Sequence, residues 1–165
     1  NRKYLVNSVR ILSGNDSQFI SYNDDSNENA STKESDAIAD IEEKLDVKMP
    51  EFYYRPYGME YMRYEIETEP DVARVEYEYN DNIILVYVNK QNEGTASNIS
   101  SLNGNEKVVD KISNHGTEIV VKEMKDEKDK ISTYIVSWEK DDVAYYIVGK
   151  IEFDEIKKIV EYMKF

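Results

Sequence analysis

The sequence predicts an α+β protein with a mainly antiparallel sheet of six to eight strands and two helices packed on it. Apolar residues recur at helical spacing in two places, near residues 37–45 and 156–163. Between these stretches the apolar period is two, which is typical of strands. From residue 107 to residue 149 the turns between the strand segments are too short to hold crossover helices, so the sheet should be mainly antiparallel. A chain of 165 residues is long enough for one domain with a core.

Residues 1–33 form an N-terminal element followed by a polar loop. Residues 2–12 are apolar enough for a strand or a helix, and the pattern favours a strand only slightly. Residues 13–33 are rich in Ser, Asn and Asp, whose side chains compete with regular backbone pairing, so we expect an exposed, flexible loop. The single α+β domain is then expected to span residues 34–165.

The first helix is expected to begin at the capping-box spacing of Ser31 and Glu34, or at Ser35. It should end before Pro50, because the residue ahead of a proline is forced out of helical geometry. Its apolar face is formed by four residues. They are Ala37, Ile38, Ile41 and Leu45.

Two strands with one buried face should follow, joined by a hairpin to a strand that is buried on both faces. In the first, Met62, Tyr64 and Ile66 alternate with charged residues; in the second, apolar positions 73–79 alternate with charged residues in the same way. A turn at 80–82 is expected, because Asn and Asp tolerate left-handed backbone angles. The return segment 83–88 is apolar throughout, which indicates a central strand covered on each side.

Four more strands and a final helix complete the prediction. The strands are Lys107–Ile112, Glu118–Met124, Ile131–Glu139 and Val143–Gly149, with turns at 114–116, 125–130 and 140–142. The helix should begin near Asp154 and end with Lys164, an order of charges that suits the helix dipole. Its apolar face is expected to contain Ile156, Ile159, Val160 and Met163.

Charge and composition exclude several classes of partner. The net charge of −13 repels phosphate backbones and anionic lipid surfaces, so we expect no nucleic-acid partner and no peripheral membrane docking. There is no cysteine, which excludes disulfides, thiolate metal sites and cysteine nucleophiles. The longest apolar run, 83–88, is far too short to span a bilayer. The chain begins at Asn1 without an initiator Met, so a signal or anchor removed from the N-terminus is expected.

The sequence contains no recognisable catalytic constellation. His115, the one histidine, lies in an Asn-His-Gly turn, and no nucleophile elbow or phosphate-binding glycine loop is present. The acidic run from Asp24 lacks the Gly and Glu of a calcium loop, since Asn29 and Ser35 occupy those positions. We therefore predict no catalytic, cofactor-binding or metal-binding residues. With 34 acidic residues, a glycosidase-like carboxylate pair remains the alternative.

The aromatic segment 49–59 is the candidate contact surface. Tyr53, Tyr54 and Tyr57 surround Arg55, and prolines stiffen the backbone. Tyr and Arg are favoured at recognition hot spots, so these four residues are candidates for contact with a partner. The other interpretation is that the rings seal an edge of the core and Arg55 only pairs with a carboxylate.

Three stretches together resemble the bacterial domain of unknown function 4367. They are the connector Met49–Met59 with its Tyr-Arg-Pro-Tyr-Gly run, the hairpin Val75–Val88, and the ending from Trp138 through Gly149 and Glu155 to Val160. The resemblance covers about residues 34–165. The usual Ser-Leu near the end of the family is replaced here by Tyr162-Met163.

This resemblance implies a place outside the cell membrane. Members typically follow a single N-terminal transmembrane helix in Gram-positive bacteria, and some lie beside sigma-factor or anti-sigma-factor systems. The family has no established catalytic residues to carry over. We therefore expect a non-catalytic, extracytoplasmic binding or sensory domain that is anchored only by an upstream segment and contacts a protein, peptide or envelope component. The alternative is a carboxylate-dependent hydrolase of cell-wall or other glycans.

Overall fold

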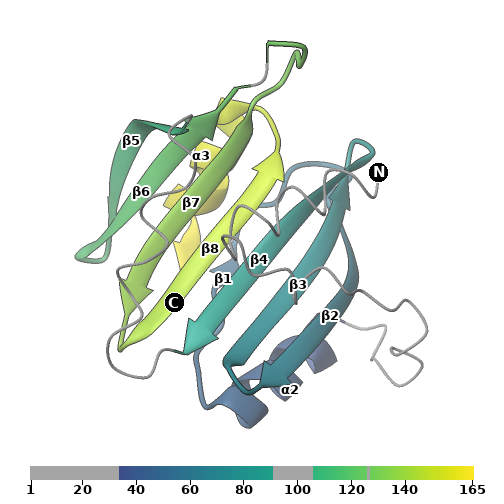
Figure 1. Ribbon diagram of the computed structural model, residues 1–165, viewed down its shortest axis with the longest axis vertical. Coiled ribbons are helices and arrows are strands. Elements are labelled where there is room, and N and C mark those ends of the chain that lie inside the picture. Colours follow the sequence, from purple (N-terminus) through teal and green to yellow (C-terminus); the bar gives the residue numbers. More distant parts are fainter. Residues whose placement is uncertain (1–33, 91–105, 126) are drawn as a thin grey trace.

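The computed structural model describes residues 34–90, 106–125 and 127–165. Their main element is a seven-stranded antiparallel sheet in the order β2-β3-β4-β8-β7-β6-β5, with two helices on one face (Figure 1). The strands are β2 (Glu60–Thr68), β3 (Asp71–Tyr79), β4 (Asn82–Lys90), β5 (Glu106–Asn114), β6 (Thr117–Met124), β7 (Thr133–Lys140) and β8 (Val143–Lys150). A small second sheet pairs β1 (Glu51–Phe52) with β9 (Met163–Lys164). The predicted fold class is confirmed.

The two helices are those that the apolar periodicity predicts. Helix α2 (Glu34–Leu45) buries Ala37, Ile41 and Leu45, and it ends where Asp46 takes a positive φ of 50°. Helix α3 (Phe153–Glu161) buries Ile156, Ile159 and Val160. The predicted first element, residues 2–12, and the polar loop 13–33 lie outside the described residues.

Three hairpins close through two-residue turns in which both residues have positive φ. The turns are Asn80–Asp81, His115–Gly116 and Asp141–Asp142. This geometry matches the right-handed twist of the flanking strands, and Asn, Asp and Gly adopt it at the lowest cost. The sequence prediction of these three turns is therefore confirmed, and His115 lies exposed in a turn.

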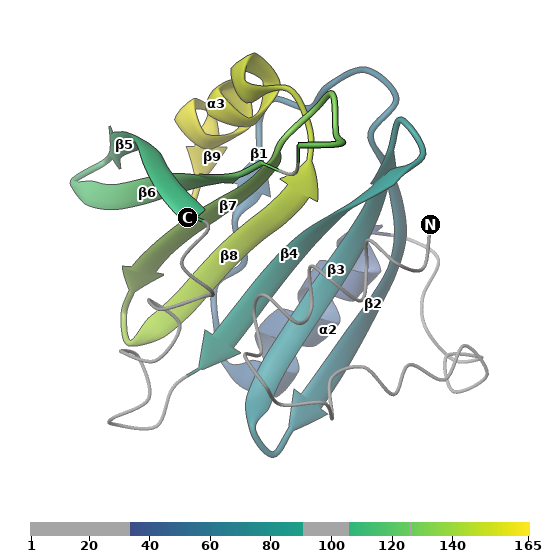
Figure 2. The same cartoon turned by 45° about the horizontal axis from the view of Figure 1, so that its top comes forward.

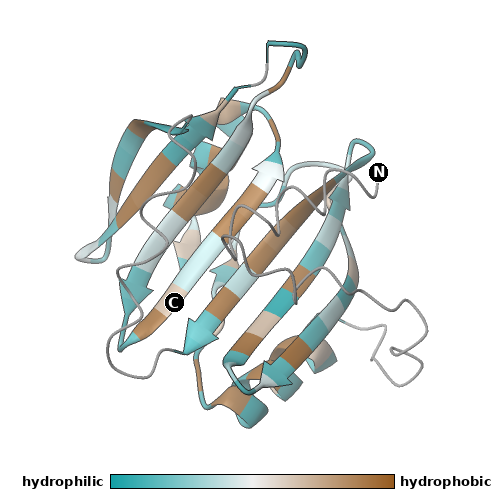
Figure 3. Cartoon of the chain, in the orientation of Figure 1, coloured by the Kyte–Doolittle hydropathy of each residue, from teal (hydrophilic) through white to brown (hydrophobic). Residues whose placement is uncertain are grey.

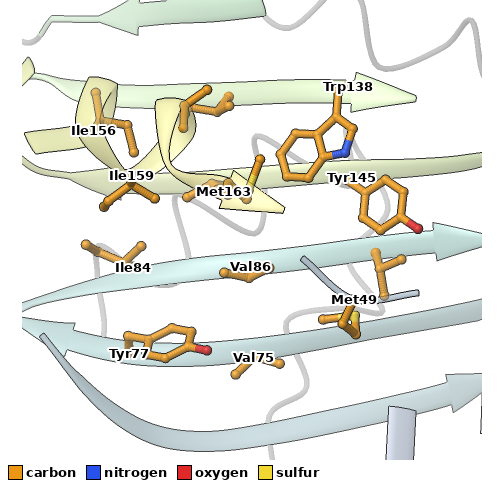
Figure 4. Close-up of a cluster of buried hydrophobic side chains, with 14 of the residues drawn as sticks. Met49, Val75, Tyr77, Ile84, Val86, Trp138, Tyr145, Ile156, Ile159 and Met163 are labelled. Atoms are coloured by element: carbon orange, nitrogen blue, oxygen red, sulfur yellow. The ribbon is translucent and has the colours of Figure 1, made fainter. Parts of the chain in front are cut away.

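Helices α2 and α3 cover the same face of the sheet, which we call the inner face (Figure 2). One large cluster of buried side chains lies between them and the strands. In Figure 4, Ile156 and Ile159 of α3 lie with Ile84 and Val86 of β4 and with the aromatic rings of Trp138 and Tyr145. The Trp138 and Tyr145 rings are stacked, with centroids 5.2 Å apart. Trp138 is therefore a core residue.

The central strands are buried on both faces. Strand β4 is apolar over most of its length, whereas β2 alternates between apolar and polar residues (Figure 3). A second buried cluster lies on the outer face, opposite the helices; it consists of Val72, Leu85, Tyr87, Ile135, Ala144, Tyr146 and Val148. The prediction that segment 83–88 is a strand covered on each side is confirmed.

Three residue-level expectations were wrong. Met62 is exposed, because a β-bulge between Tyr61 and Arg63 shifts the register of β2 by one residue. Arg74 and Glu76, which the alternation placed on a solvent face, are buried. Met163 is not helical: α3 ends at Glu161, and Met163 belongs to β9, where pairing with β1 takes over.

Candidate functional site

The connector between α2 and β2 is held in place at its start by two hydrogen bonds. The backbone N–H of Met49 donates to the Glu42 carboxylate at 2.9 Å. The Tyr145 hydroxyl donates to the Lys48 carbonyl at 2.7 Å. The pairing of β1 with β9 then fixes the next residues against the end of α3. The connector is therefore an ordered segment that joins both helices.

Arg55 has a structural role within the connector. Its guanidinium makes a two-pronged ion pair with Glu34, the first residue of α2, with one Nη1–Oε2 distance of 2.6 Å. The same group lies over the rings of Phe52 and Tyr77, 5.8 and 5.4 Å from their centroids. The hydrogen bond with Glu34 raises the Arg55 pKa further, so the charge is permanent. Arg55 thus pairs with a carboxylate, as the interpretation that gave it only a structural role expected.

Tyr54 is half-buried against α3. Its hydroxyl donates to the Glu155 carboxylate at 2.5 Å, which raises the Tyr54 pKa. Its ring lies 6.4 Å from that of Tyr162, and the Lys158 ammonium lies 5.5 Å from its centroid. These contacts fasten the connector to the helix and leave part of the ring exposed.

Tyr53 and Tyr57 point to solvent. Tyr53 is 62% exposed, and Tyr57 is fully exposed in a turn closed by the Met59 N–H, which donates to the Pro56 carbonyl at 3.1 Å. Gly58 supplies the positive φ of 85° that this turn requires. On the Tyr53 ring, the Lys164 ammonium lies 4.7 Å from the centroid. The interpretation that all these rings seal the core is therefore wrong for Tyr53 and Tyr57.

Tyr162 extends this surface and was missed by the sequence analysis. Its side chain is 59% exposed, its ring lies beside Tyr54, and its carbonyl accepts a hydrogen bond from the Tyr53 N–H at 3.2 Å. The helical period gave no signal for it, because residue 162 follows Ile159 by three and would lie near the buried side of a continued helix; it is exposed because α3 ends at Glu161. We call Tyr53, Tyr54, Tyr57 and Tyr162 the tyrosine surface.

Three described carboxylates have shifted pKa values, and two of them, Glu34 and Asp40, lie in structural hydrogen bonds. Burial would raise the Glu34 pKa, but hydrogen bonds from Arg55 and Tyr77 outweigh it, and the pKa lies below its ordinary value. A hydrogen bond from Tyr64 lowers the pKa of Asp40. Burial raises the pKa of Glu106 on the edge strand β5. A glycosidase acid needs a raised pKa beside a second, ionised carboxylate, and Glu34 and Asp40 are shifted in the opposite direction.

The described ranges hold neither a cluster of metal-binding side chains nor a helix that could span a membrane. Among residues 34–90, 106–125 and 127–165, no three His, Asp or Glu side chains gather closely enough to hold a metal ion. In the same ranges, neither helix has the length and apolar character needed to cross a membrane.

Comparison with known proteins identifies a family. The model of the domain of unknown function DUF4367 matches residues 49–163. The chain belongs to the DUF4367 family. No curated protein and no solved structure matches it. In this DUF4367 domain the match begins at the connector and ends in β9, so it contains all four residues of the tyrosine surface.

Proposed function

We propose that this DUF4367 domain is a non-catalytic binding domain whose tyrosine surface contacts a protein, a peptide or an envelope component. The observation that carries the proposal is the combination of exposed rings and a fixed backbone. Tyr53 and Tyr162 are each more than half exposed, yet a hydrogen bond between their main chains and the β1–β9 pairing hold them in place. Exposed aromatic rings on an ordered segment bind at a low entropic cost.

The chemistry of the surface suits a mixed polar and apolar ligand. A tyrosine ring offers a large apolar area and a hydroxyl that can donate or accept a hydrogen bond. Lys158 and Lys164 lie over two of the rings, so positive charge accompanies the aromatic area in a chain that is strongly acidic as a whole. The location that we propose, outside the membrane and behind an upstream anchor, rests on the family resemblance.

The test removes the exposed rings and leaves the fold intact. A triple variant, Tyr53→Ser, Tyr57→Ser and Tyr162→Ser, is compared with wild type in pull-downs from a solubilised envelope fraction and in co-sedimentation with purified Gram-positive cell wall. We expect a retained partner or polymer to bind at least about tenfold more weakly, because hot-spot tyrosines contribute about 2 kcal/mol or more.

The matched control changes exposed apolar residues elsewhere. Met62 and Val108 lie on the two edge strands and are 43% and 46% exposed. The double variant Met62→Ser and Val108→Ser should bind as wild type does. Equal binding by the triple variant would refute the role of the tyrosine surface, and release of reducing sugar ends from the wall would indicate the hydrolase instead.

A further inference from the structure

Two lysines beside the tyrosine surface contact aromatic rings and no carboxylate. The Lys164 ammonium lies 4.7 Å from the centroid of the Tyr53 ring, and the Lys158 ammonium lies 5.5 Å from that of the Tyr54 ring. Within the described ranges, neither lysine takes part in an ion pair. Acidic residues outnumber basic ones by 34 to 21 in this chain, so these two lysines form a local exception to its negative charge.

Each of the two lysines has a glutamate within reach, yet that glutamate has other partners. Glu51 lies opposite Lys164 in the β1–β9 pair, but its carboxylate is 3.6 Å from the Lys48 ammonium and accepts a hydrogen bond from a tyrosine hydroxyl at 3.3 Å. Glu155 precedes Lys158 by three residues on α3, but its carboxylate accepts a hydrogen bond at 2.5 Å from a tyrosine of the connector. The two ammonium groups are therefore left to pair with an anion of another molecule.

We propose that the tyrosine surface binds an acidic peptide segment of a partner protein, with carboxylates of the peptide paired to Lys158 and Lys164. This inference rests on the proposed function, and it names the class of partner for the same surface. Each ammonium already lies over a ring, so less side-chain freedom is lost when a carboxylate pairs with it. The exposed ring of Tyr162, beside Tyr54, offers apolar area to a neighbouring side chain of the peptide.

The charge of the whole chain favours a short acidic segment over a long anionic polymer. The net charge of −13 repels a polyanion that extends past the two lysines over the rest of the surface. Such repulsion is screened beyond about 8 Å at physiological ionic strength, so a peptide with a few carboxylates at the lysines largely avoids it. A peptide also has apolar side chains for the rings and main-chain groups for the tyrosine hydroxyls.

Selection from random dodecapeptides displayed on phage tests the class of partner, with the full wild-type chain as the bait. We expect the enriched peptides to combine an excess of acidic residues with an aromatic or aliphatic residue. Their synthetic copies, measured by fluorescence anisotropy, should bind more weakly as the salt concentration rises, because exposed charge pairs are screened.

A pair of neutral variants tests the lysines directly. Lys158→Gln with Lys164→Gln should weaken binding of the enriched peptides roughly fivefold or more and reduce its dependence on salt. The matched control, Lys125→Gln with Lys130→Gln, removes the same charge from exposed positions in the β6–β7 turn. That turn lies at the opposite end of β6 from the β5–β6 turn, and Asn114 beside the latter contacts the end of α3. The control should bind as wild type does.

A gain of affinity gives a second readout that a damaged fold cannot imitate. Glu161 is exposed and is three residues from each of the two lysines along the chain, so its charge opposes an acidic peptide. Glu161→Gln should therefore tighten binding of the enriched peptides by roughly twofold.

The outcomes separate this inference from the proposed function. Enriched peptides that need the exposed tyrosines but bind equally to both lysine variants would overturn the inference and leave the proposed function standing. Peptides that bind the triple tyrosine variant as well as wild type would contradict the proposed function itself. Selection without enrichment of acidic peptides would also overturn the inference. Lysine-dependent binding of purified wall teichoic acid in that case would favour an anionic polymer, and lysine-dependent self-association would favour a second copy.

Discussion

At the scale of single residues, the Glu34 carboxylate joins three parts of the fold. It belongs to the first turn of α2, pairs with Arg55 of the connector, and accepts a hydrogen bond at 2.7 Å from the Tyr77 hydroxyl of β3. Burial and this hydrogen-bonded carboxylate raise the pKa of Tyr77 well above its ordinary value, so Tyr77 remains a donor. The position of the connector, and hence of the tyrosine surface, depends on this contact.

We predict that Glu34→Gln destabilises the protein at neutral pH by about 1.5–3 kcal/mol, the range for hydrogen bonds to a charged group. The folded pKa of Glu34 is lowered, so its contribution is complete above the unfolded pKa and is lost as the pH falls through the folded pKa. The difference in stability between the two proteins should therefore begin to shrink as the pH falls below about 4.3, the ordinary pKa of a glutamate, and vanish only below the lowered pKa of folded Glu34. Urea unfolding from pH 3 to 7 measures this.

The matched control is Glu43→Gln, an exposed glutamate on the same helix. It should change the free energy of unfolding by less than about 0.5 kcal/mol at every pH. A loss for Glu34→Gln that is equally large at pH 3 would mean that packing, and not the ionised carboxylate, supplies the stability.

The sequence predicted the type of partner for Arg55 but not which carboxylate it would be. Arg55 and Glu34 are 21 residues apart, and Tyr77 lies a further 22 residues along the chain. Local periodicity places each of them on an element, but it cannot say which elements meet. The burial of Arg74 and Glu76 was missed for the same reason, since alternation shows two faces and does not show what covers either one.

At the scale of elements, the β5–β6 hairpin stabilises the end of α3 through a buried side chain. The last carbonyls of a helix lack partners within it. The Asn114 amide, which is 6% exposed, donates to the carbonyls of Val160 at 3.0 Å and Met163 at 2.8 Å. The sequence marked Asn114 only as a turn residue, although its side chain joins two elements.

We predict that Asn114→Ala lowers the free energy of unfolding by about 1–3 kcal/mol, because it leaves two buried carbonyls without these donors. Hydrogen exchange in α3 and β9 should accelerate more than exchange in β2 and β3. The neighbouring Ser113, exposed on the same strand, provides the control variant Ser113→Ala, which should be near neutral. Uniform acceleration across the whole sheet would argue against a local role.

Element types were predictable here because their periods are strong, while some of their ends were not. Helix α3 was expected to continue through Met163 to Lys164, but pairing of β9 with β1, more than 100 residues earlier, ends it at Glu161. The bulge in β2 similarly exposes Met62. In both cases a long-range backbone contact outweighs a local pattern.

At the scale of the whole molecule, the sheet consists of two meanders joined at its centre. Strands β2-β3-β4 and β5-β6-β7-β8 each follow chain order, and β8 returns to pair with β4. The sequence predicted that β4 would be central, because it is apolar on both faces. It could not predict that β8 would be its neighbour, because hairpin signals specify only consecutive strands.

The junction between the meanders depends on a close approach at Gly149. This residue lies opposite Ile84, and an added Cβ would be 3.0 Å from Ile84 Cγ1 and 3.2 Å from Ile84 Cα. We predict that Gly149→Ala lowers the free energy of unfolding by about 1–3 kcal/mol. Strands β4 and β8 each lie between two other strands, so they can move apart only slightly. Ile84→Ala removes the Cγ1 contact, so in that background Gly149→Ala should lower the free energy of unfolding by less. A double-mutant cycle of urea unfolding measures the difference. If the two substitutions were additive, the cost would arise elsewhere, and Gly149 would not be the point of close contact through which the two halves of the sheet meet.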